Sequence, residues 1–205
     1  MQILKRAALF SAAAMAIGAA PVLSQTVSYT TAGAFTGTGC AGTSCTEGTF
    51  TLSFVGNVGP NAYLSGSQID LGSFQVQCNN APATCPMATI PGGTTFTLTI
   101  TQSAPTGGTG SFTGTVSGQV AFNPDFSSLV WTPTTSSLVI GGVTYSLTID
   151  NSGNIQIPGP TLTSQNPNVT QVKGHVDVTP EPSTVALMAT GIVGLVPLAR
   201  RRRRK

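Results

Sequence analysis

Apolar and polar side chains alternate with a period of two in several segments of the chain. In residues 50–54, phenylalanine and leucine alternate with threonine and serine, and residues 96–100 and 143–149 follow the same rule. Residues 172–178 place valines on one face and Lys173, His175 and Asp177 on the other. This alternation is typical of half-buried β-strands. Residues 25–179 show no comparable helical periodicity.

Interruptions of the alternation indicate turns and irregular strands. In residues 69–78 the apolar positions change parity at Gly72-Ser73, which predicts a β-bulge. Gly141-Gly142 predicts a two-residue hairpin turn, because glycine tolerates a positive φ. We expect a glycine-interrupted strand over 112–122 and short strands at 129–131 and 154–157. The pattern predicts an all-β domain over residues 25–179, an antiparallel β-sandwich or jelly-roll-like fold of about eight to ten strands.

Charge is scarce and lies mostly at the two ends of the chain. Charged residues make up 7% of the sequence, against about 25% in ordinary soluble domains. Basic residues cluster at Lys5-Arg6 and in residues 200–205, and Lys173 is the one cation between them. The acidic residues are Glu47, Asp70, Asp125, Asp150, Asp177 and Glu181. The body therefore has no basic patch, which argues against a nucleic-acid partner.

Residues 1–24 have the three parts of a secretory signal peptide. Lys5 and Arg6 precede an apolar run over residues 7–20, and residues 22–24 offer a cleavage site before Gln25. That run is shorter than the roughly 20 residues that a membrane span needs. We expect export through the Sec translocon, with removal of this segment by signal peptidase.

Four cysteines follow in the exported body, and an even number in such a chain predicts disulfides. Three connectivities are possible for Cys40, Cys45, Cys78 and Cys85. We favour the local pairs Cys40–Cys45 and Cys78–Cys85, because each closes a short turn-forming segment. Zinc is the competing interpretation, but the spacings are wider than C-x2-C, and the single histidine, His175, is remote.

The composition changes abruptly after Thr179. Pro180-Glu181-Pro182 is followed by an uncharged apolar run over residues 183–199 and then by Arg200, Arg201, Arg202, Arg203, Arg204 and Lys205. As a helix, that run would be about 25 Å long, at the short end for a membrane span. The basic cluster behind it would stay cytoplasmic as a stop-transfer signal, leaving the body outside.

This three-part tail resembles the PEP-CTERM sorting signal of Gram-negative bacteria. The resemblance covers residues 180–205 and rests on the tripeptide, the short apolar run and the terminal arginines in that order. It implies an exosortase substrate that is held briefly in the inner membrane and cut near Pro180–Pro182 by a transpeptidase-like membrane enzyme. Delivery to the cell surface or the extracellular polymer matrix would follow. A permanent single-span anchor with the same sequence remains the alternative.

We predict no catalytic, cofactor-binding or metal site in the body. His175 lies on a solvent-facing strand surface in the predicted pattern, without a nucleophile motif to support a triad. Asp150 opens a segment that begins like a calcium loop, but the twelfth position is Thr161, so a turn is expected.

The sequence therefore favours a non-enzymatic surface or matrix protein linked to exopolysaccharide. The first alternative is a carbohydrate-binding module that uses Trp131 or Tyr63, although Trp131 and Tyr145 lie in strand patterns typical of a core. A secreted hydrolase is the second alternative, and it would need two carboxylates about 5–9 Å apart in a cleft.

Overall fold

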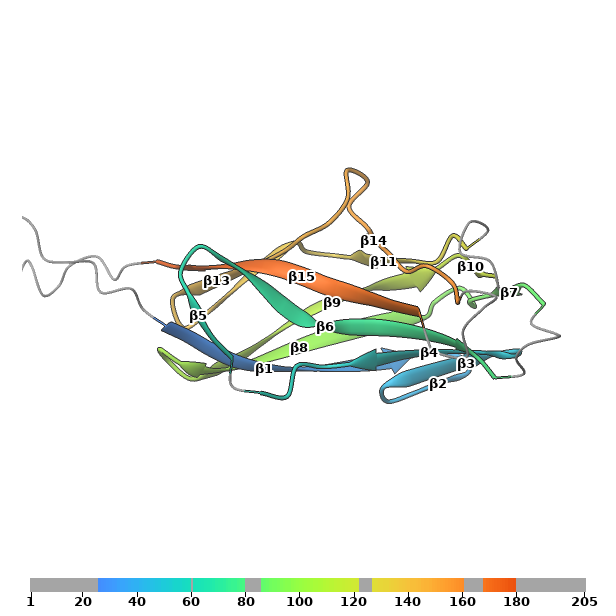
Figure 1. Ribbon diagram of the computed structural model, residues 1–205, viewed down its shortest axis with the longest axis horizontal. Helices are drawn as coiled ribbons and strands as arrows, with labels where there is room; N and C mark the ends of the chain where they lie inside the picture. The colour runs from blue at the N-terminus through green and yellow to red at the C-terminus, as the bar shows by residue number, and fades with distance from the viewer. Residues whose placement is uncertain (1–25, 60, 80–85, 122–126, 161–167, 180–205) are drawn as a thin grey trace, which may run out of the picture.

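The computed structural model describes residues 26–59, 61–79, 86–121, 127–160 and 168–179, and these form an all-β fold (Figure 1). The strands are β1 (Thr26–Thr36), β2 (Cys40–Ala41), β3 (Ser44–Glu47), β4 (Phe50–Val55), β5 (Asn61–Leu64), β6 (Ser67–Cys78), β7 (Ala88–Thr89), β8 (Thr95–Ala104), β9 (Gly108–Ser117), β10 (Gln119–Val120), β11 (Val130–Pro133), β12 (Ser137–Ile140), β13 (Val143–Leu147), β14 (Ile155–Gln156) and β15 (Asn168–Val178). The predicted antiparallel all-β class is confirmed, since every strand pair is antiparallel.

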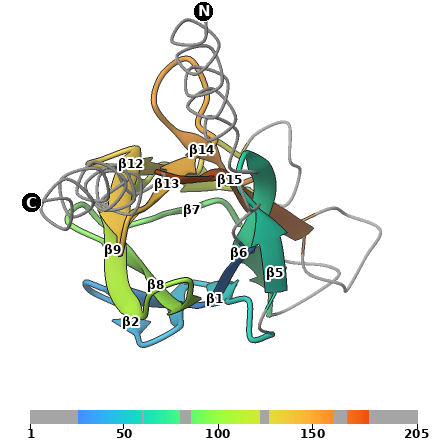
Figure 2. The same ribbon diagram turned by 90° about the vertical axis from the view of Figure 1, so that its left-hand side faces the viewer.

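Two large sheets enclose one core. The first has the order β14-β11-β9-β8-β1-β5, the second has the order β12-β13-β15-β6-β4-β3-β2, and β10 pairs with β7 separately. Seen along the long axis in Figure 2, the sheets curve around a common interior like two half-barrels. They also meet at their edges, because Phe35 N on β1 donates a hydrogen bond to Gly42 O in the β2–β3 turn at 2.6 Å.

Aromatic side chains fill the centre of this interior. Phe35, Phe54, Phe74, Phe96 and Trp131 are all buried, and Trp131 and Phe96 have no exposed surface. Their ring centroids lie 4.7–6.2 Å apart in tilted or edge-to-face arrangements. Contacts of this kind add about 0.5–1.5 kcal/mol per pair beyond the burial of apolar area. Because these rings come from both sheets, the cluster holds the two sheets together.

The two predicted irregularities are present. On β6, Leu71 and Gly72 together lie opposite Val172 of β15, because the register shifts between Gln171↔Ser73 and Lys173↔Asp70. Gly72 has φ +117°, and the β-bulge turns both Leu71 and Gly72 into the core. The hairpin between β12 and β13 has Ile140 paired with Val143, and both intervening glycines have positive φ.

Two predictions about strands were wrong, and one long strand was not predicted. The described residues contain fifteen strands rather than eight to ten, because strands of two to four residues are too short to show an alternating pattern. The sequence pattern also missed β1, whose buried face carries Thr31 and Gly33 between larger residues. The long strand expected over 112–122 begins earlier, at Gly108, and breaks at Gly118, where φ is +114°.

Both ends of the described fold lie at one end of the molecule. β1 begins and β15 ends at the left of Figure 1, while β7 and β10 lie at the right. Thr26 pairs with Leu64 just before the β5–β6 turn, and Val176 pairs with Ser67 just after it. This turn therefore lies between the first and the last strand of the domain.

Candidate functional site

The junction with the predicted sorting tail is the first candidate site. β15 is a central strand, flanked by β13 and β6, and Val178 pairs with Val143. Thr179 N donates a hydrogen bond to Gly142 O at 3.0 Å, and Val178 N donates one to Ser65 Oγ at 2.9 Å. The fold therefore holds the backbone as far as the residue before Pro180.

The predicted tail itself lies outside the described residues. This applies to Pro180, Glu181 and Pro182, to the apolar run 183–199 and to the basic residues 200–205, as it does to the signal segment 1–24. Within the described ranges, no helix is long and apolar enough to cross a membrane. The signal peptide, the membrane span and the stop-transfer role stay predictions from sequence.

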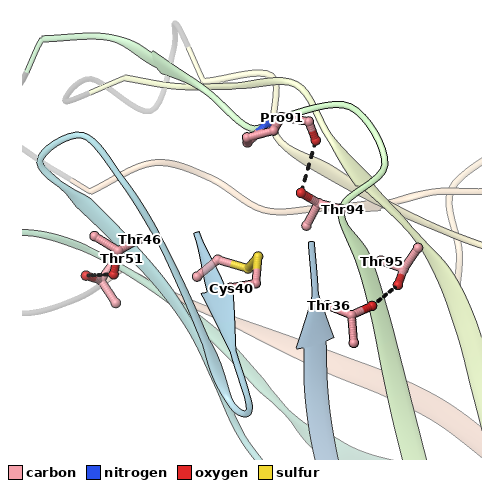
Figure 3. Close-up of a disulfide and its surroundings, with 8 residues drawn as sticks. Thr36, Cys40, Thr46, Thr51, Pro91, Thr94 and Thr95 are labelled. Carbon is pink, nitrogen blue, oxygen red and sulfur yellow. Dashed lines mark hydrogen bonds between the residues drawn. A yellow bond between two sulfur atoms is a disulfide. The ribbon is translucent and has the colours of Figure 1, made fainter. Parts of the chain in front are cut away.

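The Cys40–Cys45 disulfide is confirmed. Cys40 on β2 lies directly opposite Cys45 on β3, with 3.9 Å between their Cα atoms. Figure 3 shows the bond inside this short hairpin, beside the Thr46–Thr51 hydroxyl pair that links β3 to β4. Cys78 is also disulfide-bonded, and its expected partner, Cys85, lies outside the described residues.

The three aromatic residues considered for sugar binding differ in their exposure to solvent. Trp131 and Tyr145 have no exposed surface, as their strand patterns indicated. The hypothesis that Trp131 contacts a polysaccharide is therefore wrong, because its ring packs against Phe74 and Phe96. Tyr63 on β5 is half-buried, and it stacks on Tyr29 with ring centroids 5.6 Å apart.

Two buried tyrosine hydroxyls make hydrogen bonds between the sheets that the sequence pattern did not predict. Tyr29 donates to Asp70 O at 2.8 Å, and Tyr145 donates to Gln102 Oε1 at 2.7 Å. Gln102 in turn donates to Thr106 O at 2.6 Å. Burial raises the pKa of both Tyr29 and Tyr145 above the usual range. These hydroxyls stay protonated at neutral pH and act as structural donors between the two sheets.

A shallow groove of about 440 Å³ lies between the β4–β5 loop and the outer face of β6 and β15. Its polar lining includes Asn57, Asp70 and Gln171, and Tyr63 contributes an aromatic side chain. Asp70 Oδ1 accepts a hydrogen bond from Gly72 N at 2.9 Å, which fixes the carboxylate next to the β-bulge. An aromatic ring beside amide and carboxylate groups can contact the apolar face and the hydroxyls of a sugar. The bulge and the loop could not be placed together from sequence alone.

The single histidine is exposed, as expected. His175 lies on the outer face of β15 with Lys173 and Asp177, while Val172 and Val176 on the other face are buried. Within the described ranges, no three His, Cys, Asp or Glu residues are grouped closely enough to hold a metal ion.

Asp150 forms a turn, as the sequence predicted. Its Oδ1 accepts hydrogen bonds from Ser152 N at 2.9 Å and Asn154 N at 2.8 Å, and Oδ2 accepts one from Gln156 Nε2 at 3.0 Å. The amide of Gln156, followed by the backbone N–H of Asn154, lowers the pKa of this carboxyl below its ordinary value. The side chain therefore stabilises the β13–β14 connection.

Comparison with known families identifies a motif in the C-terminal part of the chain. Residues 178–204 match the PEP-CTERM protein-sorting motif. The match begins at Val178, so its first two residues belong to the hydrogen-bonded end of the fold. Comparisons with curated proteins and with solved structures found no match. The chain is a protein with a C-terminal PEP-CTERM sorting motif, which implies exosortase-type processing and a surface or extracellular location.

Proposed function

We propose that this chain is a non-enzymatic β-domain protein that is held briefly in the inner membrane and then released to the cell surface or the exopolysaccharide matrix. The motif match at residues 178–204 carries the proposal. The signal segment 1–24 would direct export, and the apolar run 183–199 would halt in the bilayer with residues 200–205 inside the cell. Cleavage near Pro180–Pro182 would then free the domain.

The end of β15 supports this order of events. Because Thr179 is hydrogen-bonded to Gly142, the sheet protects the backbone up to the tripeptide. The two prolines that follow keep the chain extended around Glu181, and an extended segment suits the cleft of a processing enzyme. A cut within 180–182 would leave β15 whole, so the mature domain would lose no strand.

Processing can be tested by changing the tripeptide. A Pro180→Ala, Pro182→Ala variant should accumulate as uncut precursor in the inner-membrane fraction, whereas Ser183→Ala, one residue beyond the tripeptide, should be processed normally. Immunoblotting of fractionated cells would show the two forms. Release of the double variant at the wild-type rate would contradict a role of the tripeptide in processing. Retention of the uncut wild type in the membrane fraction would instead favour a permanent anchor whose prolines are only a spacer.

Carbohydrate binding remains a second candidate function, supported by the groove beside Tyr63. The groove combines this ring with Asp70 and Gln171. In a pull-down with exopolysaccharide, Gln171→Ala should reduce retention if the groove binds sugar. Ser146→Ala on the outer face of β13 is the matched control, because it lies outside the groove. Equal retention of wild type and Gln171→Ala would argue against this function.

The proposal of a non-enzymatic role draws on two of the carboxylates that the structure describes. Asp150 is engaged in its own turn, and Asp70 accepts a hydrogen bond from the β-bulge. Both carboxylates therefore accept backbone hydrogen bonds that stabilise the local structure. An assay of the purified protein against polysaccharide from its own matrix tests this directly, and release of reducing ends would establish a hydrolase.

A further inference from the structure

The distance between the fold and the apolar run is very short. Thr179 is fixed by its hydrogen bond to Gly142, and the uncharged run begins at Ser183. An extended chain covers at most about 3.6 Å per residue, so these two positions lie no more than roughly 14 Å apart. The headgroup layer on one side of a bilayer is about 5–7 Å thick. If residues 183–199 are inserted in a bilayer, most of the junction would therefore lie within or just above the headgroups.

Three turns surround the point where the chain leaves the fold. The β5–β6 turn contacts β15 through Ser65 and through a hydrogen bond from Gly66 N to Val176 O at 2.7 Å. The β12–β13 turn accepts the last hydrogen bond of the fold at Gly142. The β8–β9 turn lies beside it, because a Cβ on Gly141 would approach Thr106 to 2.9 Å. Together with the ends of β1 and β15, the turns form one surface, the tail-side face: Thr26, Leu64, Ser65, Gly66, Pro105, Thr106, Gly107, Gly141, Gly142 and Thr179.

The tail-side face is exposed and carries no charged residue. Leu64 is 54% exposed, although it is a large apolar side chain. The acidic residues of the described body lie elsewhere, and the nearest one along the chain is Asp177, on the outer face of β15. A neutral surface of small residues with one protruding leucine can approach lipid headgroups without desolvating a charge or being repelled by anionic lipid.

We propose that in the uncut precursor the tail-side face lies against the lipid surface, held there by the short junction. The proposal rests on the proposed function, because it needs residues 183–199 to be inserted in a bilayer. The domain then stands on the membrane with its disulfide hairpin pointing away. The ten steps along β1 from Thr26 to Thr36 place that hairpin about 33 Å farther out. The processing enzyme must therefore reach the tripeptide at headgroup level.

Fluorescence quenching in vesicles tests this geometry. The full precursor without its signal segment, in variants Leu64→Trp and Thr43→Trp, is reconstituted into phosphatidylcholine vesicles that contain lipid with a nitroxide on the headgroup. Thr43 is the matched control, because it is exposed in the distal β2–β3 turn. The buried Trp131 contributes equally to both and is subtracted with the parent protein. We expect the Leu64→Trp signal to be quenched several-fold more strongly than the Thr43→Trp signal.

The possible outcomes distinguish the position of the tail-side face from the presence of the membrane span. Equal quenching of the two variants, in precursor that floats with the vesicles, would overturn the apposition of the tail-side face. Precursor that does not float with the vesicles would instead overturn the membrane span and with it the proposed function. A glycine–serine linker of about 20 residues inserted after Thr179 should lower the quenching of Leu64→Trp, since it extends the tether by tens of ångströms. Unchanged quenching would show that the short junction is not what holds the face at the lipid.

Discussion

Substitution of Gly72 by alanine tests the β-bulge on β6, which lines the outer groove. Gly72 has φ +117°, where side chains other than glycine are strained by about 1–3 kcal/mol. A Cβ there would lie 2.5 Å from Phe54 Cζ and 2.6 Å from Val55 O. Relieving such contacts in a packed core costs about 1–3 kcal/mol more. We therefore expect Gly72→Ala to lower the free energy of unfolding by about 2–6 kcal/mol.

Alanine substitutions at two other glycines distinguish the backbone strain from the steric overlap in the core. Gly153 has φ +81° with no atom within 4 Å of a Cβ, so Gly153→Ala should show the backbone strain alone. Gly92 has open space and no positive φ, so Gly92→Ala should be neutral or stabilising by about 0.4–1 kcal/mol. Urea unfolding of the oxidised protein, followed by the fluorescence of Trp131, measures all three. The reasoning is refuted if Gly72→Ala unfolds at the same urea concentration as Gly92→Ala.

Three further predictions concern the disulfide, a turn and a buried hydrogen bond. Replacing Cys40 and Cys45 by serine should lower the free energy of unfolding by about 2 kcal/mol, because the closed loop is short; a urea midpoint equal to that of the oxidised wild type would contradict this. The Asp150 pKa is lowered in the fold, so its stabilisation is present above the ordinary pKa of about 4 and is lost as the pH falls through the lower folded-state value. Asp150→Asn should therefore destabilise at pH 6 and do so progressively less as the pH falls below about 4, and a pH-independent difference in urea unfolding would show that the carboxylate charge does not stabilise the turn. Tyr145→Phe removes the donor to the buried Gln102 Oε1 and should cost about 1–3 kcal/mol; thermal unfolding at the wild-type temperature would show that this hydrogen bond contributes nothing.

The sequence predicted those parts of the fold in which local pattern and burial coincide. The paired glycines of the β12–β13 turn and the change of parity at Gly72 have local causes, and both features are present. β1 was missed because Thr31 is buried for a non-local reason, since its hydroxyl donates to Leu71 O at 2.8 Å and accepts from Asn57 N at 2.7 Å. A buried polar residue with distant partners looks like a solvent-facing one in sequence.

Among the candidate sites, too, those formed by contiguous residues could be predicted from sequence, whereas those formed by distant residues could not. The sorting motif is a contiguous pattern, so residues 180–205 could be recognised without a structure, and the family match at 178–204 agrees. The groove and the tail-side face are built from turns and strands far apart in sequence, such as Tyr63 with Gln171 and Ser65 with Val178. The structure also excluded Trp131 as a sugar contact, because it fixes which side of a short strand faces the core.

The intact mass of the protein extracted from the cell surface tests the central claim most directly. The account predicts a chain that starts near Gln25, ends within Pro180–Pro182 and keeps Thr179, with both disulfides oxidised and all six terminal basic residues absent. Surface protein whose mass still includes Arg200–Lys205 would contradict it, because the tail would then be an anchor rather than a signal that is cut away.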